Sequence, residues 1–477
     1  KLKERLDSLA WNGKYYTHHI PIDSQVNRDF GGTDQSAQVS LSNAYSLNRT
    51  LSHEPSVAII NSYREIRDKM PETSPGEWYT IYPPFNKGFH LDKWEYMNGG
   101  VTPIVAGELA HGAFEHGFEK YAVSILNRLH KLGKKNDNYL HSAYRGMKAD
   151  LPDRSFIPLN ITKFATAKYP GLEPREDGQW LTKGADSIQA FHHIPFRIPN
   201  PEKNERTAIQ VTKSSAAPNI VTLPIDDRAK SLYFLHESEP GNIAGSLILN
   251  YDDGSSYTDY ITNEKIGNWW IEPGNNKVKK AWRTNNKNYF IAFYVYGLNN
   301  PYPEKNIKSI QIKAATKNNY YVKSITLSDY EVYFPPDMIS YGIPDNWGAA
   351  AVTYALVEGL MGIKNQGQAF SRVLVAPRWE ASDVTKATAT AKYVSSVGYL
   401  SYKYKKEDTA LRISFTGSAT KTNVRLLMPK IEKIDRVMLN GNETEKYRLE
   451  IIESSLYFVI EVNGKGTYQL DIDYNNL

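Results

Sequence analysis

The sequence predicts a multidomain α and β protein, in which a helical domain is interrupted by one antiparallel β-sandwich and followed by a second. Three observations predict this. Apolar residues recur at helical spacing up to about position 183, and the period changes to two from about position 189. Helical spacing returns once, in DNWGAAAVTYALVEGLMGI, and alternating strands then resume. A helix that resumes after about 150 strand-rich residues indicates a sandwich inserted into a helical body.

The helical elements are bounded by recognisable signals. EPSVAIINSYREIRDKM has apolar residues on one face, and Pro55 fits its first turn. A helix is expected from about Thr102, with Pro103 in its first turn, and a second follows at once. Gly112 and Gly117 lie around the junction, where a break in the helix is least costly. The pattern predicts a helical hairpin with a short turn.

Two groups of strands follow. The first contains PNIVTLPI, KSLYFLH, GSLILNY, NYFIAFYVYG and IKSIQIKA, and the second runs from YLSYKYKK to TYQLDIDY. MLNGNE and EVNGKG each predict a hairpin turn at Asn-Gly. The predicted domains are therefore residues 1–186 (helical, first part), 187–335 (inserted sandwich), 336–366 (last helix) and 367–477 (terminal sandwich).

Composition excludes several classes of function. The 477 residues carry 57 Lys and Arg against 52 Asp and Glu, without a basic block, so no nucleic-acid partner is expected. No apolar run is long enough for a membrane span. Without cysteine, thiolate chemistry and zinc-thiolate clusters are excluded. The sequence starts at Lys1 without an initiator Met or signal peptide, so a processed, proteolysed or engineered start is expected.

Three stretches resemble the six-hairpin, (α/α)6-toroid glycosidases, the group that contains α-L-rhamnosidases and glucoamylases. MNGGVTPIVAGELAHGAFEHG is similar to the start of a barrel helix in that group, and YGIPDNWGAAAVTYALVEGLMGI to its last barrel helix. FSRVLVAPRW with KYVSSVGYLSYKYKK is similar to the segment leading into its C-terminal sandwich. The insert, with NYDDGSS and GNWW, resembles galactose-binding-type jelly rolls.

The resemblance implies an (α/α)6-toroid, an inserted carbohydrate-binding-like jelly roll and a C-terminal sandwich. Only about half of the toroid helices are recognisable in the sequence. Either further helices went unassigned, or a missing N-terminal part of the same enzyme completes the ring and holds one catalytic carboxylate. The implied activity is glycoside hydrolysis of a plant, algal or host polysaccharide or oligosaccharide, and the implied location is the periplasm or the cell exterior.

Glycoside hydrolysis uses two carboxyl groups, about 6.5–9.5 Å apart in inverting enzymes and about 5–5.5 Å apart in retaining ones. Glu95 is the first candidate, because it lies beside Trp94 and shortly before Asn98 and two glycines in KWEYMNGG. The indole could raise the pKa of a carboxyl group, as a general acid requires, and the Asn98 amide could bind a sugar hydroxyl. The competing interpretation is a solvated loop residue beside a turn.

Three further carboxylates are candidates. Asp345 precedes the late helix, where the resemblance implies a general base, although Asp is also a favoured N-cap. Asp34 follows Gly31-Gly32, and capping competes with catalysis there too. Glu108 lies one turn inside its helix, and either faces the barrel axis or forms an ordinary surface pair.

Aromatic and imidazole side chains provide candidate sugar subsites. WNGKYYTHHIPID contains several, GEWYTIYPPF contributes one indole and the late helix another, and each is open to the alternative of simple packing. The candidates are Trp11, Tyr16, His18, His19, Trp78 and Trp347. His18 and His19 are adjacent and lack the spacing of a helical metal pair, so neither a metal nor another cofactor is expected.

Two other functions stay open at the level of sequence. A polysaccharide lyase would use Tyr16, His18 and His19 to abstract a proton from a uronate, and its products would carry an unsaturated ring. A non-catalytic carbohydrate-binding protein would retain the same aromatic residues without a working carboxylate pair. The leading prediction is an inverting glycoside hydrolase with catalytic residues among Glu95, Asp345 and Asp34.

Overall fold

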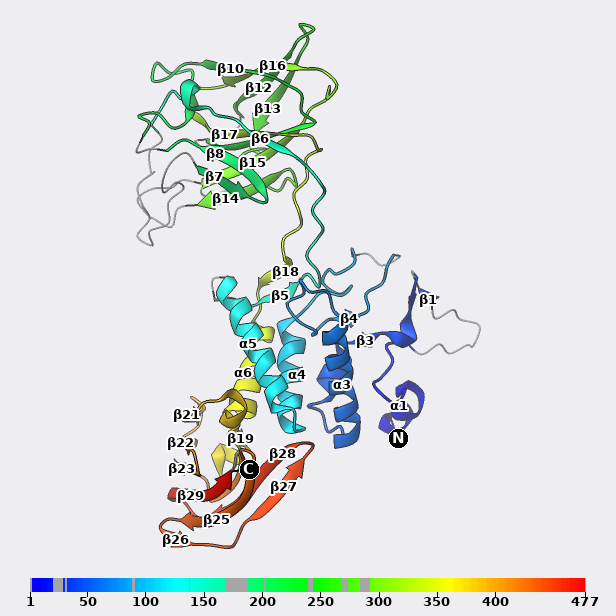
Figure 1. The fold of residues 1–477 in the computed structure, drawn as a ribbon, viewed down its shortest axis with the longest axis vertical. Helices are drawn as coiled ribbons and strands as arrows, with labels where there is room; N and C mark the ends of the chain where they lie inside the picture. The colour runs from blue at the N-terminus through cyan, green and yellow to red at the C-terminus, as the bar shows by residue number, and fades with distance from the viewer. Residues whose placement is uncertain are drawn as a thin grey trace. The chain divides into compact units, whose positions relative to one another are not determined.

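The structure, a computed structural model, forms two compact units (Figure 1). Unit 1 comprises Lys1–Lys148 and Asp337–Leu477, and unit 2 comprises Ala149–Pro336. None of the helices in the described part of the chain is long and apolar enough to cross a membrane. The residues described are 2–19, 29–30, 32–87, 91–136, 138–168, 187–200, 203–238, 243–267, 273–283 and 292–476.

Helix α4 lies at the centre of the helical part of unit 1 and packs against the helices α2, α3, α5 and α6. Its small residues allow close contact, because a Cβ on Gly107 would lie 2.4 Å from the carbonyl carbon of Ala351 in α6. The helices are α1 (Leu2–Ala10), α2 (Ser42–Ser46), α3 (His53–Lys69), α4 (Pro103–Glu115), α5 (Glu119–Lys135) and α6 (Asn346–Tyr354), which continues as a π-helix (Ala355–Leu360).

The six α-helices found in the described residues are half of those in a six-hairpin ring, so the expected toroid is not confirmed. Short two-stranded sheets connect the helices instead. The sheets are β1 (Asp29–Phe30) with β2 (Thr33–Asp34), β3 (Val39–Ser40) with β4 (Ile81–Tyr82), and β5 (His141–Tyr144) with β18 (Ile339–Pro344). Strands β5 and β18 are antiparallel and lie at the two ends of unit 1 where unit 2 is inserted.

Unit 2 is an antiparallel β-sandwich with a main apolar core and a second, smaller apolar cluster that includes β8. It begins at Ala149, upstream of the boundary expected at 187, because β6 (Phe156–Pro158) pairs with β17 and is too short to show a period. One sheet has the order β10 (Ile220–Asp227), β16 (Ile307–Ala314), β12 (Ile243–Tyr251), β13 (Ser256–Thr262). The other has β14 (Val278–Arg283), β15 (Ala292–Asn299), β11 (Ser231–Ser238), β17 (Tyr320–Ser328) and β6, with β9 (Ile209–Val211) also on β17; β7 (Ser187–Phe191) and β8 (Ile194–Ile198) form a hairpin.

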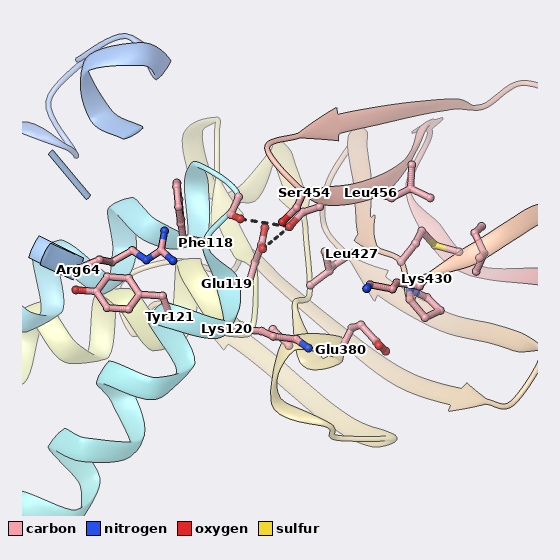
Figure 2. A pocket seen from close by; sticks show the side chains of 16 residues that line it. Arg64, Phe118, Glu119, Lys120, Tyr121, Glu380, Leu427, Lys430, Ser454 and Leu456 are labelled. Carbon is pink, nitrogen blue, oxygen red and sulfur yellow. Dashed lines mark hydrogen bonds between the residues drawn. The ribbon is translucent and has the colours of Figure 1, made fainter. Parts of the chain in front are cut away.

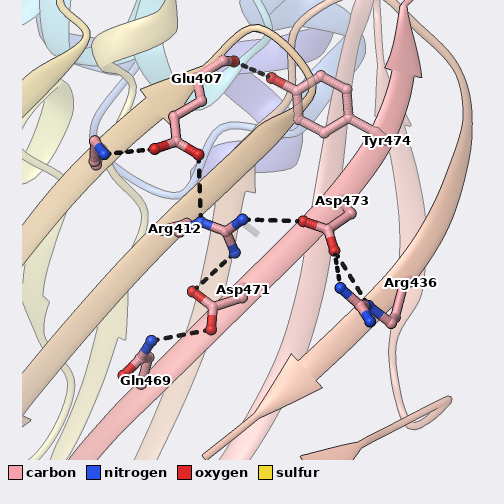
Figure 3. A network of polar contacts seen from close by, with 8 residues as sticks. Glu407, Arg412, Arg436, Gln469, Asp471, Asp473 and Tyr474 are labelled. Carbon is pink, nitrogen blue, oxygen red and sulfur yellow. Dashed lines mark hydrogen bonds and ion pairs between the residues drawn. The ribbon is translucent and has the colours of Figure 1, made fainter. Parts of the chain in front are cut away.

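The C-terminal strands of unit 1 form a second sandwich. One sheet has the order β19 (Ile363–Asn365), β20 (Arg372–Val375), β24 (Lys421–Leu427), β28 (Ser455–Asn463), β27 (Arg448–Ile452). The other has β21 (Lys386–Lys392), β22 (Tyr399–Glu407), β23 (Ala410–Gly417), β29 (Gly466–Asn476), β25 (Ile431–Leu439), β26 (Asn442–Glu443). A partly exposed polar network, in which Arg412 contacts Glu407, Asp471 and Asp473, crosses neighbouring strands of this second sheet (Figure 3).

The two predicted Asn-Gly turns differ in outcome. Asn440 and Gly441 both have positive φ and join β25 to β26, which are paired, as expected for a tight hairpin. Asn463 and Gly464 instead connect β28 to β29, which belong to opposite sheets of the sandwich. The second expectation was wrong, because a turn signal does not reveal which strands pair.

Candidate functional site

Glu95 lies in a loop whose side chains are engaged in contacts within the protein. Its carboxylate forms an ion pair with Arg145, which is itself almost fully buried. Asn98 is only 1% exposed, and its side chain donates to the carbonyls of Phe85 and Leu91 and accepts from the Phe85 amide. The amide predicted to bind a sugar hydroxyl is therefore occupied within the loop.

The double glycine of this loop has a packing explanation. Gly99 has a φ of +88°, which favours glycine, and a Cβ on Gly146 would lie 2.2 Å from the carbonyl oxygen of Gly99. The ring of Trp94 packs near those of Tyr79 and Tyr82 at 5.8 and 6.2 Å between centroids. The glycines thus permit close approach of two protein segments.

Glu95 and Asp345 each have partners of their own within the protein. Asp345 caps helix α6 by accepting from the amides of Trp347 (3.1 Å) and Gly348 (3.2 Å), which is the competing interpretation weighed from sequence. The amide of Tyr96, next to Glu95, donates to Ser340, and Asp345 lies five residues further along.

The remaining N-terminal candidates mostly make internal contacts. Asp34 caps a short 3₁₀ helix by accepting from the Ser36 amide at 2.9 Å. Tyr16 donates to Asp7 at 2.6 Å, and burial together with Asp7 raises the pKa of Tyr16 to about 12. Burial, and to a lesser extent His19, lowers the pKa of His18. The ring of His18 packs edge-on against Phe85, with 6.2 Å between centroids, and the Phe85 backbone is the hydrogen-bond partner of Asn98 in the Glu95 loop.

Trp78 is fully buried in the core shared by the helices, so neither face of its indole is open to a sugar. The guanidinium of Arg128 lies 4.5 Å from its ring centre and forms an ion pair with the buried Glu77. The stacking role expected for Trp78 is therefore incompatible with this packing. Its neighbours in sequence, which read as a surface loop, gave no sign of this burial.

A second group of predicted residues lies along the contact between α4 and α6. Gly348, Ala351 and Gly359 lie level with Pro103, Gly107 and Phe114 respectively, so the two helices run side by side in the same direction. Burial raises the pKa of Tyr45, and the nearby carboxylates of Glu108 and Asp345 raise it further. Glu108 and Asp345 therefore lie on the same side of the contact between α4 and α6, near Tyr45.

We name the polar part of this contact the α4–α6 centre. Glu108 accepts hydrogen bonds from Arg49 (3.0 Å) and from the side chain of Asn48 (2.6 Å). Asn48 also contacts His111, whose ring stacks on Tyr354 with 4.2 Å between centroids. The residues of the centre are Tyr45, Asn48, Arg49, Glu108, His111, Tyr354, Glu358 and Lys364.

Glu358 occupies the π-helix that follows α6, an irregularity often found at functional sites. Its Oε2 lies 3.8 Å from His111 Nε2 and 3.7 Å from Lys364 Nζ. Burial first, and then Glu358, raises the pKa of Tyr354 to about 12, with smaller contributions from Glu115 and Glu108. Three carboxylates thus act on one tyrosine.

Most of this centre was missed from sequence. Glu108, His111 and Glu115 have the spacing i, i+3 and i+7, which places three titratable side chains on one face of a helix of otherwise small and apolar residues. This polar face on an otherwise apolar helix was the sequence feature that could have indicated the α4–α6 centre. Glu358 could not be recognised, because its position depends on the π-helix.

A cavity of about 560 Å³ lies between the N-terminus of α5 and the C-terminal sandwich (Figure 2). Arg64, Lys120 and Lys430 contribute positive charge to its lining. Its Glu119 carboxylate is engaged by the hydroxyls of Ser455 and Tyr457, which join the helices to the sandwich. Within the described residues, no cluster of three or more His, Asp or Glu side chains could hold a metal ion.

Comparison with known proteins gives little further information. No protein-family model and no curated protein matches the sequence. Solved structures with partial similarity include an α-L-rhamnosidase from Dictyoglumus thermophilum, with 15% identity, a TM-score of 0.21, and coverage of 30% of this chain and 15% of that one.

Another is the catalytic unit of a thermostable GH87 α-1,3-glucanase from Streptomyces thermodiastaticus strain HF3-3, with 14% identity, a TM-score of 0.20, and coverage of 38% of this chain and 26% of that one. Both neighbours are glycoside hydrolases, and the chain aligns with about a quarter or less of either. Similarity of this extent carries no argument about activity.

Proposed function

We propose that the protein is a glycoside hydrolase whose reaction centre is the α4–α6 centre, with Glu108 and Glu358 as its paired carboxylates. The observation that carries the proposal is that His111, which contacts Asn48 beside Glu108 and lies 3.8 Å from Glu358, stacks on Tyr354, which is 41% exposed on the surface of α6. Carboxylates from two segments and a half-exposed ring thus come together where a saccharide can reach the ring.

We assign the two carboxylates to an inverting reaction, which needs about 6.5–9.5 Å between them to leave room for a water. His111 links them: its Nδ1 contacts Asn48, which donates to Glu108, and its Nε2 lies 3.8 Å from Glu358. Glu108 accepts from Arg49 and Asn48, which suits a base held in place, and Glu358 is assigned as the acid.

Two exposed rings supply a surface for a saccharide. Trp347 is 77% exposed and lies seven residues before Tyr354, so both rings are on one face of α6, about 10 Å apart. Ala350 lies between them and leaves the surface open. Flat rings with polar edges bind sugar faces, which favours a polysaccharide or oligosaccharide substrate. Such a substrate places the protein outside the cytoplasm. Asp345 lies at the far end of this surface.

The lyase alternative is disfavoured by the tyrosines. A lyase that abstracts a proton with a tyrosinate needs a phenol with a lowered pKa. The pKa values of Tyr16, Tyr45 and Tyr354 are all raised instead, mainly by burial. A mechanism with two carboxylates does not need a tyrosine with a lowered pKa.

The test is digestion of a glycan library by the purified chain, with mass spectrometry and ultraviolet absorbance of the products. We expect saturated, hydrolysed products and a loss of about 100-fold or more for Glu358→Gln and Glu108→Gln. Glu65→Gln, which removes an exposed carboxylate paired with Lys14, is the matched control and should retain activity. Ultraviolet-absorbing products would establish a lyase, and binding without any product would establish a carbohydrate-binding protein.

A further inference from the structure

The hydrogen bonds around His111 determine which of its ring nitrogens carries a proton. Asn48 Nδ2 donates to the backbone carbonyl (2.8 Å) and the carboxylate (2.6 Å) of Glu108, so Asn48 Oδ1 faces His111 Nδ1 at 2.5 Å. An amide oxygen can only accept, and His111 therefore carries its proton on Nδ1. In the neutral ring, Nε2 is left with a lone pair.

That lone pair faces a carboxylate oxygen in a buried setting. His111 is 2% exposed, and Nε2 lies 3.8 Å from Glu358 Oε2. Both atoms are buried, and neither has a hydrogen-bond partner among the residues that the structure describes. The ammonium of Lys364 lies 3.7 Å from the same carboxylate oxygen, beyond hydrogen-bond distance, so neither acceptor gains a hydrogen bond from it. Two buried acceptors that face each other form a hydrogen bond only if a proton lies on one of them.

We propose that His111 and Glu358 share one titrating proton and therefore behave as a single coupled acid–base pair. The pair is the proton store of the α4–α6 centre. Its use in catalysis rests on the proposed function: the proton passes to the glycosidic oxygen as the bond from that oxygen to the anomeric carbon breaks. The attacking water places its hydroxyl on that carbon, and its remaining proton goes to Glu108 and returns through solvent to the pair.

Glu115 is a second carboxylate near His111, and the charged groups around it keep it ionised. Glu358 is therefore the carboxylate that shares a proton with His111. Burial acts to raise the pKa of Glu115, but Arg378 and Lys364 outweigh this effect and hold the pKa below its ordinary value. Glu115 therefore stays ionised at neutral pH. The groups that face the pair are Tyr354 on α6, Glu108 and Glu115 on α4, His116 just after α4, Arg49 after α2, Lys364 on β19, Arg378 between β20 and β21, and Arg425 on β24.

The proposal is tested by a pH titration of the full chain with ¹⁵N-labelled histidine and ¹³C-labelled glutamate, read by NMR without substrate. In the wild type we expect the imidazole of His111 and the carboxyl of Glu358 to show common titration steps. Glu358→Gln should lower the His111 midpoint by about one pH unit or more, a tenfold change in its proton affinity. Glu65→Gln should leave it unchanged.

Independent midpoints for the two groups in the wild type would overturn the proposal without any mutation. An unchanged His111 midpoint in folded Glu358→Gln would overturn it as well. A coupled titration in a chain that cleaves no glycan would leave the pair standing and refute the proposed function. Glycan cleavage that requires Glu358, in a chain whose His111 and Glu358 titrate independently, would support the proposed function and refute the coupled pair.

Discussion

A buried histidine in unit 2 predicts how the sandwich responds to acid. His236 on β11 is fully buried, and its Nε2 lies 3.1 Å from the carbonyl oxygen of Lys265, to which it donates. Its Nδ1 lies 3.1 Å from the hydroxyl of Tyr320, from which it accepts. The neutral ring is thus fully satisfied. Burial lowers the pKa of His236 to about 3, although the hydrogen bond to Lys265 acts in the opposite direction.

The sign of the effect follows from this lowered pKa. The unfolded chain binds a proton at His236 below about pH 6.5, whereas the folded chain resists it, so acid favours unfolding. The stabilising contribution is fully present above about pH 6.5 and is lost as the pH falls toward about 3. Between about pH 8 and about pH 5 the loss amounts to about 2 kcal/mol.

Hydrogen exchange with mass spectrometry measures this loss locally. Exchange of β11 and β17 amides, corrected for intrinsic rates, gives the opening free energy of unit 2 at each pH. In His236→Gln the imidazole is replaced by an amide that does not titrate. The opening free energy of unit 2 in this variant should fall by about 2 kcal/mol less than in the wild type between about pH 8 and about pH 5. The same slope in both proteins would refute the assignment of acid sensitivity to His236.

Three further predictions concern unit 1, each read by chemical denaturation. Gly107→Ala should cost about 1–3 kcal/mol, because the new Cβ would meet backbone of Ala351 and force α4 and α6 apart; an unchanged stability would contradict the close contact. Arg378→Met should lower the free energy of unfolding by about 3 kcal/mol. Loss of the fully buried guanidinium removes its ion pair with Glu115 and its hydrogen bond to the Gly359 carbonyl. Arg412→Met should cost at most about 1 kcal/mol, because its network is exposed to solvent; an equal cost for both arginines would refute this contrast.

Local features were predictable from the sequence wherever a short-range signal determines them. Pro103 lies in the first turn of α4, Asp345 caps α6, and Asn440-Gly441 forms a hairpin turn. Each depends on backbone geometry within a few residues. The change from helical to alternating periodicity likewise marked the two sandwiches, because burial of one face imposes the period of the element.

The functional surface depended on contacts between distant segments, which no local pattern encodes. The residues around Glu95 in the sequence are typical of a sugar-binding site. Its carboxylate nevertheless forms an ion pair with Arg145, fifty residues later in the sequence. Glu358 faces His111 only because Gly107 lets α4 approach Ala351 and a π-helix turns the chain. The sequence by itself therefore determined the elements and their caps, whereas tertiary packing decided which titratable groups meet, since only packing sets distances between helices.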